Sequence, residues 1–143
     1  MTRADDRSKA INNYNLAQDL LHSARTPKED FRLLEAAFTS RYHWRLIGGE
    51  EEFAISDWLI GRIYAELNDP QNAVEFSQAA ISHSQERFPH WLKASLNEGL
   101  ARAYKNAGKM DQCERFKDLA LQEVALETDK EDADAIAAQI ATL

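Results

Sequence analysis

The chain has 143 residues, of which 44% are hydrophobic, and its formal net charge is −7. The apolar content excludes general disorder, and the acidic balance argues against a duplex nucleic-acid binder and against a basic helix lying on a membrane surface. No apolar run approaches the roughly 20 residues that a membrane-spanning helix needs. Only five glycines and three prolines interrupt the chain, which predicts an all-α protein with long helices.

The lone cysteine of the sequence cannot form an internal disulfide bond. The N-terminal segment MTRADDRSK lacks the apolar core of a secretory signal. These two features predict a protein of the reducing cytoplasm. A chain of this length suits one continuous core, so we expect residues 1–143 to form a single domain.

The N-terminal part of the chain predicts two helices in succession. Residues 1–6 are polar and are expected to fray, and an apolar stripe then predicts a first helix over residues 8–24. Thr26, Pro27 and Glu29 predict the start of a second helix. The threonine would cap the backbone, the proline would occupy the first turn and the glutamate would complete a capping box.

The second helix, residues 27–47, ends at a pair of glycines, Gly48 and Gly49, one of which is expected to adopt the left-handed conformation. Residues 8–47 are therefore the first predicted hairpin. Three consecutive glutamates, residues 50–52, open the next helix, where acidic side chains complement the positive end of the helix dipole.

The central stretch, residues 51–86, predicts a second hairpin. Its turn is Asn68-Asp69-Pro70, because aspartate caps a helix and proline fits the first helical position. Gly61 lies inside the first helix of this pair, where glycine costs roughly 0.5–1 kcal/mol relative to alanine. We therefore expect Gly61 to allow close contact with the second helix.

Residues 90–126 predict a third hairpin that repeats the pattern of the second. Small, aromatic and turn-forming residues recur with identical spacing: Gly61, Tyr64, Asn68, Ala73 and Ala80 in one hairpin, and Ala101, Tyr104, Gly108, Cys113 and Ala120 in the next. This pattern resembles the tetratricopeptide repeat, a helix–turn–helix unit of about 34 residues. The resemblance implies a superhelical array of antiparallel hairpins with about seven helices, in which residues 8–47 are a degenerate first repeat.

Two features depart from that family. Gly61 and Ala101 lie 40 positions apart, whereas the family period is about 34 residues. The tryptophan position of the family falls at Asp57, and Trp58 comes one place late. A plain antiparallel helical bundle therefore remains the alternative interpretation.

The last predicted helix covers residues 130–142. Thr128 and Glu131 precede and open it with the spacing of a capping box. One of its faces is apolar, and stacked repeats need a terminal element to cover their open end. We therefore expect residues 130–142 to form a C-terminal capping helix.

Motifs for phosphate binding, for dinucleotide binding and for a nucleophilic serine are absent from the sequence. None of the four histidines has a second histidine or a cysteine at the spacing that would place two metal ligands on one helical face. Cys113 replaces a small core residue of the repeat and is expected to be a buried thiol rather than a nucleophile. We therefore expect no enzymatic activity, no metal and no cofactor.

In tetratricopeptide arrays, the first helix of each pair lines a concave groove that is the usual ligand surface. The resemblance implies these groove positions: Ile55, Trp58, Leu59, Arg62, Glu66, Ser95, Glu98, Arg102, Lys105 and Asn106. Arg62 and Arg102 are equivalent, and arginine binds carboxylates in a bidentate manner, so an acidic peptide is an expected ligand. The alternative is that both arginines pair with Glu66 and Glu98.

A second candidate contact region is the tract RYHWR, residues 41–45, because arginine and aromatic residues dominate binding hot spots. Arg41 and Arg45 are its charged members. The sequence as a whole predicts a small adaptor or scaffold module that binds a protein or peptide partner in a helical groove. A self-associating homodimer is the second hypothesis, and a small-molecule sensor or an enzyme of unknown reaction is the third.

Overall fold

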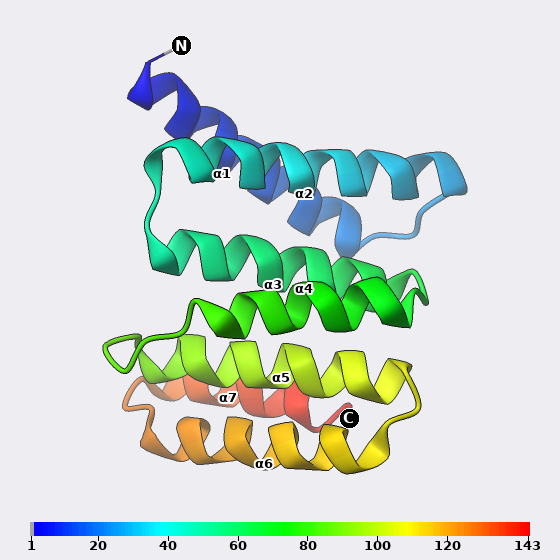
Figure 1. Cartoon of the computed structure of the whole chain (residues 1–143), viewed down its shortest axis with the longest axis vertical. Helices are drawn as coiled ribbons and strands as arrows, with labels where there is room; N and C mark the ends of the chain where they lie inside the picture. The colour runs from blue at the N-terminus through cyan, green and yellow to red at the C-terminus, as the bar shows by residue number, and fades with distance from the viewer. Residues whose placement is uncertain (1) are drawn as a thin grey trace.

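The computed structural model describes residues 2–143, which form seven α-helices and no strand (Figure 1). The helices are α1 (Arg3–Leu21), α2 (Pro27–Ile47), α3 (Glu50–Glu66), α4 (Pro70–Ser82), α5 (His90–Asn106), α6 (Met110–Leu126) and α7 (Lys130–Ile140). Antiparallel neighbours pack pairwise as α1/α2, α3/α4 and α5/α6, and the three hairpins follow one another along the long axis of the molecule. The predicted all-α array of helical hairpins is confirmed.

The turns of the second and third hairpins share one backbone conformation. Asn68, with a φ of 58°, and Gly108, with a φ of 75°, occupy the left-handed region at equivalent positions. In each turn the following residue donates its backbone N–H to the carbonyl oxygen of a tyrosine, Tyr64 or Tyr104, at 2.9 Å. The turn-forming positions that repeat in the sequence therefore also repeat in the structure.

An aromatic pair repeats in the same two hairpins. The rings of Tyr64 and Phe76 stack with their centroids 5.8 Å apart, and those of Tyr104 and Phe116 stack with their centroids 5.7 Å apart. Each pair joins the first helix of a hairpin to the second. Residues that lie 40 positions apart in the two hairpins therefore share the same aromatic packing as well as the same turn geometry.

Small residues lie where the paired helices meet. A Cβ atom added to Gly61 would lie 3.0 Å from the backbone nitrogen of Ser77 and 3.3 Å from the carbonyl oxygen of Ala73, so glycine is required for this approach of α3 to α4. Ala101 and Cys113 are fully buried in the third hairpin. The expectation that these positions form the contacts within the hairpins is confirmed.

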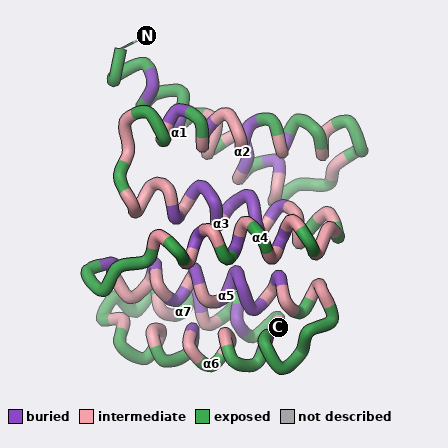
Figure 2. The backbone as a smooth tube through the Cα atoms, in the orientation of Figure 1, coloured by how far each residue is buried: buried purple, intermediate pink, exposed green. Residues whose placement is uncertain are grey.

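Successive hairpins are joined by apolar clusters, and buried positions concentrate on α3 and α5 (Figure 2). One cluster joins the first two hairpins through side chains that include Leu33, Ile60 and Ile63. A second joins the second and third hairpins through side chains that include Phe88 and Leu92. Each fully buried aliphatic or aromatic side chain contributes roughly 1.5–3 kcal/mol, so every hairpin is stabilised by its neighbour.

Helix α7 packs against α5 and α6, as expected of a capping helix. Ile136 and Ile140 become buried there, 7% and 2% exposed, in a cluster with Ala94 of α5. The predicted capping box at Thr128 is wrong by one position. Asp129 is the N-cap and accepts the backbone N–H of the residue three positions later at 3.0 Å.

The start of the chain is more ordered than its composition suggested. Helix α1 begins at Arg3, because the Thr2 hydroxyl accepts the backbone N–H of Asp5 at 3.1 Å and the Asp5 carboxylate accepts the backbone N–H of Thr2 at 3.2 Å. Asp6 is buried. The expectation that residues 1–6 fray is therefore wrong for residues 2–6, and residue 1 lies outside the described part of the chain.

The joint between α2 and α3 also differs from expectation. Gly48 and Gly49 have φ angles of −88° and −122°, so neither adopts the left-handed conformation. The joint is only two residues long, and its extended backbone carries the chain directly from one hairpin into the next. Helix α4 ends at Ser82 rather than near residue 86, and residues 83–89 form the connection to α5.

Candidate functional site

The first helices of the three hairpins, α1, α3 and α5, line one face of the array, which we call the inner face. Two apolar hollows and one polar hollow open between these helices. The two apolar hollows adjoin each other because both are lined by Tyr14 of α1 and Ile55 of α3.

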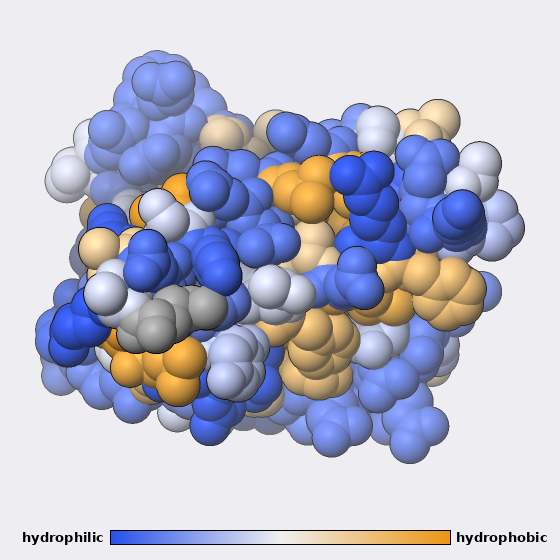
Figure 3. Space-filling model, turned by 90° about the horizontal axis from the view of Figure 1, so that it is seen from above, coloured by the Kyte–Doolittle hydropathy of each residue, from blue (hydrophilic) through white to orange (hydrophobic). Residues whose placement is uncertain are grey.

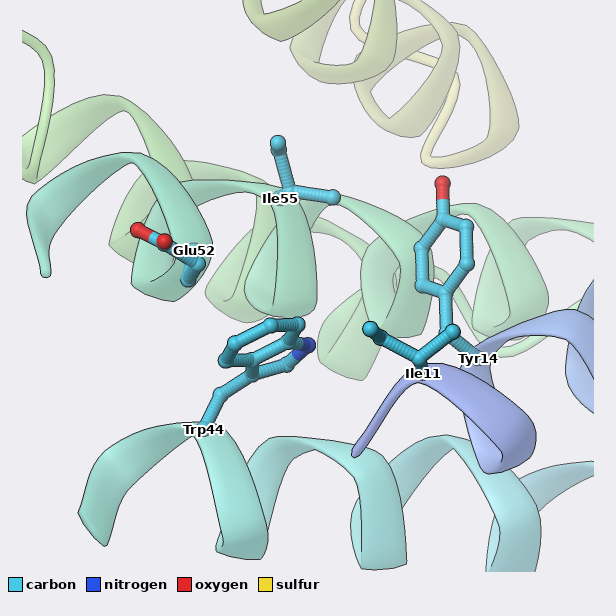
Figure 4. A pocket seen from close by; sticks show the side chains of 5 residues that line it. All are labelled: Ile11, Tyr14, Trp44, Glu52 and Ile55. Atoms are coloured by element: carbon cyan, nitrogen blue, oxygen red, sulfur yellow. The ribbon is translucent and has the colours of Figure 1, made fainter. Parts of the chain in front are cut away.

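The first apolar hollow has a volume of about 230 Å³, and five side chains surround it (Figure 4). They are Ile11 and Tyr14 from α1, Trp44 from α2, and Glu52 and Ile55 from α3. The Trp44 ring extends from α2 towards α3, so side chains from three helices of two hairpins line the hollow. The Tyr14 hydroxyl accepts a hydrogen bond from Gln18 at 2.9 Å, and burial raises the pKa of Tyr14.

The second apolar hollow, of about 140 Å³, lies between the three inner helices. Its walls are Tyr14, Ile55, Trp58, Trp91, Leu92 and Ser95. The Trp58 ring lies against the backbone of α5, where a Cβ atom on Gly99 would be 2.8 Å from Cδ1 of the ring. The buried Nε1 of Trp58 has no hydrogen-bond acceptor among residues 2–143.

The two arginines predicted to share a surface do converge, and a buried carboxylate lies between them. Glu98 is 0% exposed, and its Oε1 lies 2.6 Å from Nη2 of Arg102 while its Oε2 lies 3.6 Å from Nη1 of Arg62. Burial lowers the pKa of Arg62, and the charge of Glu98 opposes that effect. The alternative in which the arginines pair with Glu98 is therefore present in the structure.

The polar hollow lies beside this triad and has a volume of about 380 Å³. Its walls are Ala65, Glu66, Arg102, Lys105 and Asn106. The last residues of the chain already contact its two cations. Arg102 donates to the carbonyl oxygen of Gln139 at 3.0 Å and to the Thr142 hydroxyl at 2.7 Å, and Lys105 donates to the carbonyl oxygen of Leu143 at 2.8 Å. Asn106 donates to the side-chain oxygen of Asn68 at 3.1 Å.

The two arginines of the RYHWR tract have different surroundings. Arg41 donates from Nε to the buried carboxylate of Asp57 at 2.6 Å and thereby ties α2 to α3. Arg45 is exposed. Asp57 also lies 3.3 Å from His83, so this buried carboxylate contacts both α2 and the residue that follows α4.

Three of the four histidines tie together the two helices of a hairpin. In each case Nδ1 of the histidine contacts a carboxylate of the paired helix: Asp6 and His43 at 2.8 Å, Glu50 and His83 at 2.8 Å, and Glu123 and His90 at 2.7 Å. Each hairpin contains one such pair, at the end opposite the turn that joins its two helices. These contacts assign the histidines a role in helix pairing.

Within residues 2–143, His, Cys, Asp and Glu side chains form no group of three or more that could hold a metal ion. The Cys113 thiol is buried, as expected, and burial raises its pKa, so little reactive thiolate forms near neutral pH. No helix in the same part of the chain is long and apolar enough to cross a membrane.

Two of the expected groove positions are not on the surface. Leu59 is 1% exposed and Glu98 is fully buried, because both point from the inner helices into the core. Among the residues that line the two apolar hollows, sequence reasoning missed Ile11, Tyr14, Glu52, Trp91 and Leu92. The apolar stripes and the acidic first turn account for these residues within their own helices, but they do not show that the side chains meet across helices.

Comparisons of this chain with protein-family models, with curated proteins and with solved structures found no match. The arrangement itself is compatible with a helical repeat, since each hairpin packs against the next and the second and third repeat one another in turn and aromatic geometry. The inner face is the candidate site on the evidence of its three hollows.

Proposed function

We propose that the chain is a small cytoplasmic interaction module of tetratricopeptide-like design, which binds a protein or peptide partner on its inner face. The observation that carries the proposal is the pair of adjoining apolar hollows, which all three inner helices line. Concave, mostly apolar sites with a few polar groups are the usual places where ligands bind. Glu52 is the one charged residue that lines these two hollows, so they suit a partner that inserts largely apolar parts of its side chains between the helices.

The surroundings of the arginines bear on the chemistry of that partner. Arg62 and Arg102 already contact Glu98, and Arg102 also contacts the C-terminal segment. Glu98 therefore compensates one of their two positive charges, and the contacts of Arg102 with the C-terminal segment are to neutral acceptors. At the polar hollow an acidic segment would meet the exposed side chain of Lys105, which also donates to the carbonyl oxygen of Leu143.

The experiment is affinity capture from the native host, followed by mass spectrometry, with the parent chain and matched variants. Ile55→Asp places a charge in the wall that the two apolar hollows share, and Ser95→Glu alters the second hollow at a half-buried position. Leu121→Asp introduces the same charge on α6, at a side chain that is 42% exposed. We expect the inner-face variants to lose partners that the Leu121 variant keeps.

Circular dichroism and thermal melting of each variant establish that helical content is retained. Ser95→Glu keeps the test decisive if Ile55→Asp fails to fold. Capture of the same partners by both the inner-face variants and the control would show that the inner face is not the binding surface.

Self-association is a second candidate function, because one end of the array exposes large apolar side chains. On α2, Phe31 is 75% exposed, Tyr42 is 62% exposed and Leu46 is 55% exposed. Viewed from this end, the surface shows several apolar patches that hydrophilic side chains separate (Figure 3). Light scattering at high micromolar concentration tests this candidate: a concentration-dependent dimer that Leu46→Asp abolishes would support it, and a monomer throughout would remove it.

A further inference from the structure

We propose that the first apolar hollow is an anchor for a positively charged side chain, a lysine or arginine that the partner inserts with its aliphatic stem against the apolar walls and its charge beside Glu52. The inference rests on the proposed function, because it names the chemistry of a partner on the same inner face. According to this proposal, the hollow selects a side chain by its positive charge as well as by its shape.

The walls of the hollow suit a long alkyl stem. Ile11 and Ile55 approach it from α1 and α3, and the rings of Tyr14 and Trp44 stand on either side (Figure 4). Burial of each methylene group of a stem contributes about 0.8 kcal/mol. A cation near the face of tryptophan or tyrosine gains about 0.5–1 kcal/mol at an exposed site, through attraction to the electron-rich ring. The same walls can thus hold both parts of a lysine or arginine side chain.

Glu52 supplies the one carboxylate among the residues that line the hollow, and a helix cap turns this carboxylate towards the start of α3 (Figure 4). Its Oε2 accepts the backbone N–H of Gly49 at 3.2 Å, in the cap that begins α3. Gly48 brings Glu52 and Trp44 together, since an added Cβ atom would lie 3.0 Å from Cβ of Glu52 and 3.3 Å from Cε3 of Trp44. Among residues 2–143, no cationic side chain forms an ion pair with Glu52.

Glu52 differs from the other two glutamates of the same helical turn in its contacts. Glu50 contacts His83 and Glu51 lies 3.6 Å from Arg87, so Glu52 is the member of the acidic turn that contacts neither a histidine nor an arginine among residues 2–143. The Arg7 guanidinium lies 5.7 Å from the centroid of the Trp44 ring, so this ring already has one cation of the chain beside it, and a cation from a partner must use the part of the ring that faces the hollow. A net charge of −7 also attracts basic partners at long range.

Three alkyl probes of matched length test the inference directly: n-hexylammonium chloride, 1-hexanol and sodium hexanoate. Each is titrated into the folded chain at constant ionic strength, and amide and indole N–H shifts are followed by NMR. Comparison with Trp44→Phe assigns the Trp44 indole signal. We expect all shifts to centre on Trp44 and Ile55, with hexylammonium binding about fivefold more tightly than hexanol, and hexanoate binding most weakly.

The charge preference is assigned to one side chain by two matched variants. Glu52→Gln is expected to make hexylammonium and hexanol bind equally while leaving the affinity for hexanol unchanged. Glu51→Gln removes the same charge outside the hollow and is expected to preserve most of the preference.

Equal affinity of the parent chain for hexylammonium and hexanol would overturn the cation anchor, while the hollow would stand as an apolar docking site and the proposed function would be intact. Shifts that do not centre on the hollow for any probe would overturn the anchor altogether. The proposed function fails separately, if inner-face substitutions leave partner capture unchanged.

Discussion

Removal of the buried carboxylate of Glu98 should strongly destabilise the fold. Glu98→Ala leaves Arg62 and Arg102 facing each other without a counter-ion. Breaking a buried ion pair by removing one partner typically costs 3–5 kcal/mol. Both arginine side chains are 20% exposed, so their charged groups can turn towards water, and we expect the lower end of that range, about 3 kcal/mol.

Urea denaturation followed by circular dichroism measures this free energy of unfolding, and a loss of about 3 kcal/mol corresponds to a fall in Tm of about 10 °C for a chain of this size. Lys130→Ala is the control, because Lys130 forms an exposed ion pair with Asp134, of a kind worth about 0.2–1 kcal/mol. Replacing the whole triad, as Arg62→Met, Glu98→Leu and Arg102→Met together, should recover most of the loss. A cost for Glu98→Ala no larger than that of the control would refute the reasoning.

Three further predictions concern single positions. Gly108→Ala should cost about 1 kcal/mol in urea denaturation, because the turn holds this residue at a φ of 75°, where a Cβ is disfavoured. Asp6→Ala should cost about 1–3 kcal/mol in the same assay, since it leaves the buried ring of His43 without its partner at 2.8 Å. The free energy of unfolding should fall as pH rises above about 10, the ordinary pKa of tyrosine, because burial raises the pKa of Tyr14 and the unfolded chain loses its proton first. Tyr14→Phe should reduce that slope, which denaturation at a series of pH values measures.

The sequence was most informative about backbone elements, because caps, turns and small residues act locally. The capping box at Thr26 and Glu29 places the start of α2, and Asp69 and Pro70 place the start of α4. Gly61 predicted a close approach of helices that the structure contains. These signals need only residues that are near in sequence or that recur at a fixed period.

The contents of the inner face were harder to predict, because they depend on which side chains meet across helices. A periodic pattern places Glu98 on an inner helix but does not show that it turns into the core between Arg62 and Arg102. The first apolar hollow also forms from side chains of different helices, so a periodic pattern in one helix does not predict it. Tyr14 and Trp44 come from different helices of the first hairpin, and the two-residue joint at Gly48 brings the third helix against them.

The inner helices of successive hairpins form one continuous face only if α3 packs on α5, and the contact between Trp58 and Gly99 is the most direct place to measure that packing. In NOE spectra, we predict strong cross-peaks between Hδ1 of Trp58 and the Hα protons of Gly99. Absence of these cross-peaks, with the Trp58 indole N–H exchanging freely with water, would contradict the stacking of α3 on α5 and with it the proposed binding face.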